Sequence, residues 1–178
     1  MADRGWLSVS LPYVTSAASD AWQAEAAAGG GVGSQRLLEV AEVAAPAEVA
    51  AAFGVERGTV VVVRRRLMLL DDRPVELTDS YYPLAIARGT ALATPQKIRG
   101  GAVTLLAELG YRPGRTVEDV YARAPTAEER EALALGGHRW VLGLTRLITT
   151  EDGTPVEVSV MIMVADGRRL RYETKIGD

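Results

Sequence analysis

The sequence predicts an α+β fold in which helices pack on one antiparallel β-sheet. Three observations carry this prediction: stretches with strand-like alternation or many β-branched residues, short helical segments between them, and a helix-plus-hairpin unit that occurs twice. With 178 residues, of which 48% are apolar and 24% charged, the chain is long enough for one domain with a sizeable core.

Residues 1–34 are expected to form a strand, a helix and a glycine-rich loop that join the main domain, residues 35–178, in one compact unit. Trp6–Val14 alternates apolar and polar residues, and Ser16–Ala28 is an alanine-rich segment typical of a helix. The glycines between Gly29 and Gly33 end that helix in a loop. Their spacing is not that of a phosphate-binding motif.

The first helix-plus-hairpin unit follows this loop. We expect a strand, a helix and two hairpin strands in succession, at Gln35–Ala44, Pro46–Phe53, Thr59–Leu70 and Pro74–Tyr82. Gly54 lies just past the helix, and Asp71-Asp72-Arg73 supplies the hairpin turn.

The second unit is predicted from the same signals. A helix over Ala102–Leu109 and a strand over Thr116–Arg123 precede it, and its own elements are the helix Thr126–Leu135 and the hairpin strands Trp140–Thr149 and Pro155–Val164. Thr126 and Glu129 have the spacing of a capping box at the start of the second helix. Arg169–Thr174 is expected to add an edge strand.

The two units align at a nearly constant offset. Arg66-Leu67 matches Arg146-Leu147 at an offset of 80, and Pro74-Val75-Glu76 matches Pro155-Val156-Glu157 at an offset of 81. A slowly drifting offset is typical of a duplicated unit with small insertions. Two such units pack most simply as one antiparallel sheet covered by helices.

Composition excludes several kinds of chemistry. Without cysteine the chain has no disulfide, thiolate ligand or thiol nucleophile, and with one histidine, His138, a histidine-based metal cluster or catalytic triad is not expected. We predict no metal, no cofactor and no catalytic residue. The pI near 5.3 argues against nucleic-acid binding by this chain alone. The sequence shows no secretory signal or membrane-spanning run, so a cytoplasmic location is expected.

Three consecutive arginines are the first candidate site. In a strand, Arg64 and Arg66 share one face and Arg65 takes the other, so the first two can present their guanidinium groups to one anion. The alternative is a solvent-facing edge on which arginines prevent aggregation. If the pair holds an anion, replacing either by alanine is expected to weaken binding by about 1.5–3 kcal/mol, while folding survives.

The repeated glutamates are the second candidate. Glu76 and Glu157 occupy matched positions on the two hairpins, and Ser80 and Tyr82 share a strand face with Glu76. Together with the arginines they are expected to line a polar pocket for a small ligand. The alternative is a set of cross-strand Arg–Glu ion pairs without any ligand.

Several motifs in the same order resemble the UTRA domains, which are the effector-binding domains of GntR-type transcription regulators of the HutC subfamily. The similar segments are Val63 to Leu67 (VRRRL), Asp72 to Pro83 (DRPVELTDSYYP), Gly100 to Tyr111 (GGAVTLLAELGY), Arg146-Leu147, and Gly153 to Glu157 (GTPVE). The resemblance covers roughly residues 35 to 172.

This resemblance implies a chorismate-lyase-like α+β fold whose pocket binds a small effector. It further implies that Arg64 and Arg66 hold an anionic group, that Glu76 and Glu157 contact the polar head of the ligand, and that the helix after the loop begins at the pocket with Gly101. Relatives that sense sugar phosphates carry a hydroxyl and an aromatic side chain where this chain has Gly101 and Val103, and a tyrosine where it has Met163. A less polar or larger anionic effector is therefore expected.

The predicted function is a small-molecule sensor and dimerisation domain of such a regulator. The expected partners are a small anionic or polar effector and a second copy of the chain. DNA is expected to be contacted only through a winged helix-turn-helix, which is absent from this sequence, and no membrane is involved. The alternatives are a chorismate-lyase-like enzyme, a stand-alone ligand-binding protein and a dimerisation module with a decayed pocket.

Overall fold

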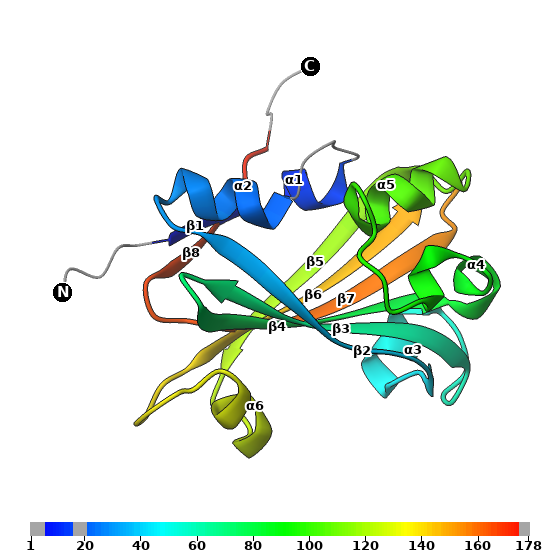
Figure 1. Ribbon diagram of the computed structural model, residues 1–178. Coiled ribbons are helices and arrows are strands. Elements are labelled where there is room, and N and C mark those ends of the chain that lie inside the picture. Colours follow the sequence, from blue (N-terminus) through cyan, green and yellow to red (C-terminus); the bar gives the residue numbers. More distant parts are fainter. Residues whose placement is uncertain (1–5, 16–20, 175–178) are drawn as a thin grey trace.

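The computed structural model describes residues 6–15 and 21–174, and its centre is a six-stranded antiparallel sheet (Figure 1). The strand order is β2-β3-β4-β7-β6-β5. The strands are β2 (Gly33–Ala44), β3 (Val60–Leu70), β4 (Arg73–Pro83), β5 (Pro113–Arg123), β6 (Val141–Thr150) and β7 (Pro155–Val164). The hairpins β3–β4 and β6–β7 of the duplicated unit meet where β4 pairs with β7, so the two units form one sheet as predicted.

Helices cover both faces of the sheet (Figure 1). On one face lie α1 (Leu11–Val14), α2 (Ala21–Ala28), α4 (Leu84–Ala87), the short 3₁₀ helix η1 (Ala91–Ala93) and α5 (Gly101–Glu108). On the other face lie α3 (Ala47–Phe53) and α6 (Ala127–Ala132). None of the helices within the described ranges is long and apolar enough to cross a membrane.

The two faces follow from the alternation of side chains along each strand. On β3, Val61 and Val63 pack with Phe53 of α3, whereas Val62 packs with Val103 and Leu106 of α5. We call the face of Val62 the cavity face, and it includes the positions that pair with it across the sheet. The apolar core thus lies on both sides of the sheet, as expected for helices on two faces.

A second, two-stranded sheet joins segments from opposite ends of the described chain. Strand β1 (Trp6–Val9) pairs in parallel with β8 (Arg168–Arg171), and Trp6 lies opposite Arg168. In Figure 1 this pair lies beside α2, above one end of the main sheet. Residues 6–15 and 21–28, which we call the N-terminal segment, therefore cover part of the cavity face.

Local chemistry explains several element ends. Asp71 and Asp72 both have positive φ angles, 49° and 61°, and such a turn matches the twist of a two-residue hairpin. Thr126 accepts from the Glu129 backbone N–H and the Glu129 side chain accepts in return, so the predicted capping box is confirmed.

Two predictions about the ends of the chain are wrong in part. The strand predicted over Trp6–Val14 ends at Val9, and α1 replaces its second half. Pro12 explains the difference, because proline cannot donate to a strand ladder but fits the first turn of a helix. The last strand pairs with β1 rather than adding an edge to the main sheet. The helix predicted over Ser16–Ala28 is present from Ala21, and residues 16–20 lie outside the described residues.

Candidate functional site

A cavity of about 580 Å³ lies between the cavity face, the start of α5 and the N-terminal segment. The floor is formed by side chains of β3, β4, β6 and β7. The loop from Lys97 to Gly101 and the first turn of α5 form one wall, and the N-terminal segment forms the roof. This volume lies in the range of small-molecule sites.

The strand register shows how the floor is arranged, because residues opposite each other in an antiparallel pair share a face. Arg66 on β3 lies opposite Thr78 on β4, which lies opposite Met161 on β7. One step along β4, Ser80 lies opposite Ser159. The row through Ser80 and Ser159 is therefore polar, whereas the row through Thr78 ends in the apolar Met161.

The duplicated unit produces the same small motif twice. The Thr78 hydroxyl donates to Glu76 Oε1 at 2.7 Å, and the Ser159 hydroxyl donates to Glu157 Oε1 at 2.7 Å. Both glutamates are buried. Each repeat thus fixes one carboxylate oxygen in the same way and leaves the second oxygen for another partner.

Most of the site residues predicted from sequence meet at this cavity. Arg66, Glu76, Tyr82, Gly101 and Glu157 line it. The Ser80 hydroxyl forms a hydrogen bond with the Ser159 hydroxyl at 2.8 Å and accepts from Arg66 Nη2 at 2.7 Å. Ser80 itself does not line the cavity, but it contacts two residues that do. Gly101 has φ +82°, a left-handed conformation that favours glycine where the chain enters α5.

Arg64 lies apart from these residues and is not part of the cavity lining. Its guanidinium donates to four backbone carbonyls that follow α4, those of Ala91, Leu92, Thr94 and Gln96, at 2.6 to 3.1 Å. Burial, opposed by Tyr82 and reinforced by the charge of Arg66, lowers the pKa of Arg64. Arg64 therefore holds the segment that leads into the cavity wall.

The polar atoms of Arg66 and Glu157 are not all used within the protein. Arg66 Nε and Glu157 Oε2 are both buried and have no hydrogen-bond partner among the described residues. Burial and the charge of Glu157 also raise the pKa of the Tyr82 hydroxyl, so this hydroxyl stays protonated. The floor therefore offers one free donor and one free acceptor to a bound molecule.

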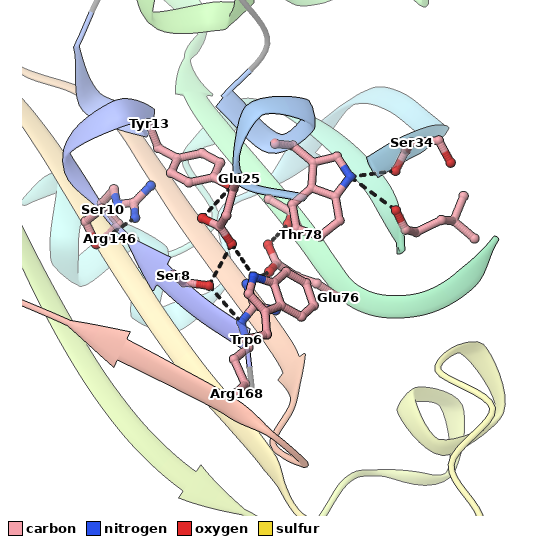
Figure 2. A network of polar contacts seen from close by, with 12 residues as sticks. Trp6, Ser8, Ser10, Tyr13, Glu25, Ser34, Glu76, Thr78, Arg146 and Arg168 are labelled. Atoms are coloured by element: carbon pink, nitrogen blue, oxygen red, sulfur yellow. Dashed lines mark hydrogen bonds and ion pairs between the residues drawn. The ribbon is translucent and has the colours of Figure 1, made fainter. Parts of the chain in front are cut away.

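The roof is held together by a carboxylate that no sequence pattern marked as a site residue. Glu25 on α2 accepts from Trp6 Nε1 at 2.7 Å, from the Ser8 hydroxyl at 2.8 Å and from the Tyr13 hydroxyl at 2.9 Å (Figure 2). Burial and the neighbouring charge of Glu25 raise the pKa of Tyr13. Glu25 thus ties α2 to β1 and α1 above the cavity.

Trp22 anchors the same roof to the main sheet. Its indole N–H donates to the backbone carbonyl of Ser34 at 2.9 Å and lies 3.2 Å from that of Leu69. The indole packs directly on Gly33, where an added Cβ would lie 2.9 Å from Trp22 Nε1. A glycine at this position lets α2 approach the start of β2.

Three further arginines line the cavity and were not predicted as site residues: Arg99, which is exposed, and the buried Arg146 and Arg168. Arg146 pairs with Glu118 on the neighbouring β5, and both side chains are buried. Arg168 pairs with Glu76 Oε2 at 2.6 Å and is likewise buried (Figure 2). Arg146 could have been predicted from the repeat, which aligns it with Arg66. No sequence pattern indicates a role for Arg168.

Comparison with known proteins identifies the class. The model of the UTRA domain family matches residues 28–168, which is most of the chain. The chain therefore belongs to the UTRA domain family, whose members are the ligand-sensing regulatory domains of GntR-type regulators. The matched range begins near the end of α2, so most of the roof lies outside it.

Individual relatives agree with this assignment. An uncharacterised HTH-type transcriptional regulator of Streptomyces coelicolor is 34% identical over 148 residues, covering 82% of this chain and 55% of the relative. The ligand-binding domain of a GntR-family regulator from Bordetella bronchiseptica superposes with a TM-score of 0.67 at 27% identity, covering 82% of this chain and 90% of that one. The effector domain of PhnF from Mycobacterium smegmatis has the same fold, with a TM-score of 0.73 at 19% identity over 87% of this chain and 94% of that one.

The chain spans about half the length of the curated relatives that it matches. The family assignment and the shared fold make the chain a ligand-sensing regulatory domain.

Proposed function

We propose that this cavity binds a small anionic or polar effector and that the chain is the sensor of a HutC-type regulator. The single observation that supports the proposal is the pair of buried, unpartnered atoms on the cavity floor, Arg66 Nε and Glu157 Oε2, within the part of the chain that the structure describes. A buried polar group costs free energy unless it is hydrogen-bonded, so a ligand that pairs with both atoms stabilises the domain.

In this proposal the roof, within residues 1–34, acts together with the main domain, residues 35–178. Arg64 contributes indirectly, by positioning the segment before Lys97, while Arg66, Glu76, Tyr82, Gly101 and Glu157 face the ligand. DNA would be contacted by a winged helix-turn-helix outside these 178 residues, and the regulator would act in the cytoplasm. Effector binding would favour one arrangement of the paired sensors and so change the spacing of the DNA-binding modules.

The test is a thermal-shift screen of the chain against sugar phosphates, carboxylates and other anionic metabolites. A compound that raises the melting temperature should bind Arg66→Ala and Glu157→Gln at least about tenfold more weakly, which corresponds to one charged hydrogen bond. Arg65→Ala is the matched control, because Arg65 lies on the opposite face with Glu39 and Asp79. A compound that binds all four proteins equally would contradict the assignment of this cavity.

We further propose binding without turnover. The expected result of incubating the chain with chorismate is no release of pyruvate, and a steady release would instead support the chorismate-lyase-like alternative.

A homodimer is proposed on the basis of β5. This strand is an edge of the main sheet, and it exposes Val117, Val120 and Tyr121, each 38–45% accessible. An exposed apolar edge strand favours pairing with an identical strand. Light scattering should show a dimer that Val120→Lys weakens, and a monomer at tens of micromolar would contradict the proposal.

A further inference from the structure

Arg168 is held on three sides, yet one of its nitrogens is not used. Its Nη2 pairs with Glu76 Oε2 at 2.6 Å and its Nε donates to the Ser8 hydroxyl at 3.2 Å. Its guanidinium carbon lies 4.2 Å from the centre of the Trp6 ring, a cation–π contact. The side chain is only 4% exposed. Nη1 is buried and has no partner in residues 6–15 and 21–174.

Arg168 lines the same cavity as Arg66, but the two arginines contact different positions of the floor. Arg168 contacts Glu76, whose other oxygen accepts from Thr78, whereas Arg66 contacts Ser80. Thr78 and Ser80 are successive positions on the cavity face of β4, and two residues of a strand span about 7 Å. The two arginines thus mark two polar ends of one floor.

Apolar and adaptable side chains lie between and beside these ends. Met161 lies opposite Thr78, while Met68 and Met163 lie opposite Glu76 on either side. All three methionines line the cavity. Because methionine is flexible and apolar, this part of the floor suits the hydrocarbon portion of a ligand rather than a row of hydroxyls.

We propose that Arg168 forms a second acceptor-binding subsite beneath the N-terminal segment, and that the effector is a two-ended molecule, a dicarboxylate with an apolar middle. One carboxylate oxygen accepts from Arg168 Nη1. The second carboxyl group accepts from Arg66 Nε and, bound in its protonated form, donates its O–H to Glu157 Oε2, so that both unpartnered atoms of the floor are used. The neighbouring Glu76 carboxylate favours a singly charged group at Arg168 over a doubly charged phosphate, because like charges repel. The inference rests on the proposed function of the same cavity and names the class of its ligand.

The experiment compares linear dicarboxylates from succinate to sebacate with monocarboxylates of the same chain length, by calorimetric titration of the chain. The best dicarboxylate is expected to bind roughly tenfold or more tightly than its matched monocarboxylate, the factor of one charged hydrogen bond. This comparison needs no variant, so it does not depend on how well a substituted protein folds.

Arg168→Lys then tests the residue. Lysine keeps a positive charge beside Glu76 but lacks the planar second nitrogen, so the dicarboxylate should fall to the affinity of the monocarboxylate. Arg123→Lys is the control, because Arg123 forms a comparable bidentate pair with Glu129 outside the cavity lining. This control variant should keep the preference for two carboxylates.

The outcomes separate this inference from the proposed function. Equal affinity for the matched acids, or a preference that survives Arg168→Lys, overturns the second subsite and leaves the sensor function standing. Tight binding of a sugar phosphate, with no binding of any dicarboxylate, would also overturn the second subsite and leave the sensor function standing. If no acid of the series binds, the subsite is also overturned, and only failure of the wider metabolite screen would count against the sensor function.

Discussion

The two hairpins of the duplicated unit carry the same chemistry but differ in what completes it. In the first hairpin Glu76 has a buried arginine partner, Arg168, whereas in the second the equivalent oxygen of Glu157 has none among the described residues. For the arginines, the charged partner is in the second hairpin instead. Arg146 forms an ion pair with Glu118, whereas Arg66 of the first hairpin bonds only to the Ser80 hydroxyl among the described residues. The partners Arg168 and Glu118 both come from strands outside the hairpins.

This difference teaches how a duplication becomes a binding site. The repeat supplies two carboxylates and two arginines at related positions on one face. Strands β5 and β8 then supply a counter-charge to one member of each pair, Arg146 and Glu76 respectively. Among the described residues, Arg66 and Glu157 have no charged partner and bond only to the hydroxyls of Ser80 and Ser159, so they remain for a ligand. The following substitutions measure that division.

The largest expected effect is at the paired glutamate. Glu76→Gln should lower the free energy of unfolding by about 3–5 kcal/mol, because it leaves the buried charge of Arg168 without a counter-charge. Glu157→Gln should cost about 1 kcal/mol or less, since it disturbs one hydrogen bond from Ser159. Urea denaturation of both variants measures the difference. Equal losses would show that the two hairpins are energetically alike.

The second effect separates the two arginines of β3. Arg64→Ala should lower the free energy of unfolding by about 2–4 kcal/mol, because it leaves one buried and three partly buried carbonyls without their donor. Arg66→Ala should cost about 1 kcal/mol, since its one hydrogen bond within the described residues goes to Ser80. Folding is still expected to survive both changes, with the larger loss of stability at Arg64. Calorimetric melting of the two variants provides the measurement, and a more stable Arg64→Ala protein would contradict it.

The third effect uses pH to test the second hairpin. Burial alone would raise the pKa of Glu118, but the Arg146 charge and the Ser10 hydroxyl outweigh it and lower the pKa. A carboxylate with a lowered pKa in the folded state stabilises the fold above its unfolded pKa of about 4.5, and this contribution is lost as the pH falls through the folded pKa.

The wild-type chain should therefore lose stability below about pH 5 more steeply than Glu118→Gln. Glu108→Gln, which alters an exposed glutamate at the end of α5, serves as the control. Unfolding curves recorded over this pH range measure the slopes. A variant with the same slope as the wild type would show that Glu118 does not contribute to acid sensitivity.

The smallest effect compares the helices of the two units. Helix α3 buries Val49, Ala50 and Phe53 and has no side-chain cap, whereas α6 buries none of its residues and depends on its capping box. Thr126→Ala should cost about 1 kcal/mol of stability. Glu131→Ala on the exposed side of α6 is the control and should cost less. A null result at Thr126 in urea denaturation would mean that α6 is held by other contacts.

The fold was predictable to a large extent because its signals are local. Alternation along the strands, the capping box at Thr126 and the offset between Glu76 and Glu157 are all properties of short segments, and the main sheet follows from them. The strand predicted through Leu11–Val14 failed because period alone does not register that Pro12 cannot join a ladder.

The site was predictable only where the repeat marked it. Arg66, Glu76 and Glu157 lie on the floor because strand alternation puts them on one face. Glu25 and Arg168 lie in segments without a repeated counterpart, and contacts between opposite parts of the chain bring them to the cavity. The role of Arg64 depends on where the carbonyls after α4 lie, which is a property of packing rather than of pattern.

The pairing of β1 with β8 has a consequence for the order in which the molecule assembles. Trp6 and Arg168 are neighbours in space but lie at opposite ends of the described chain, so the loop that they close contains nearly the whole domain. Closing long loops costs entropy and slows the formation of the contacts that depend on it. The main sheet can pair first, and the roof and Arg168 join last. A chain still emerging from the ribosome would therefore have a folded sheet before it has a complete cavity, and effector binding would begin only after β8 has been synthesised.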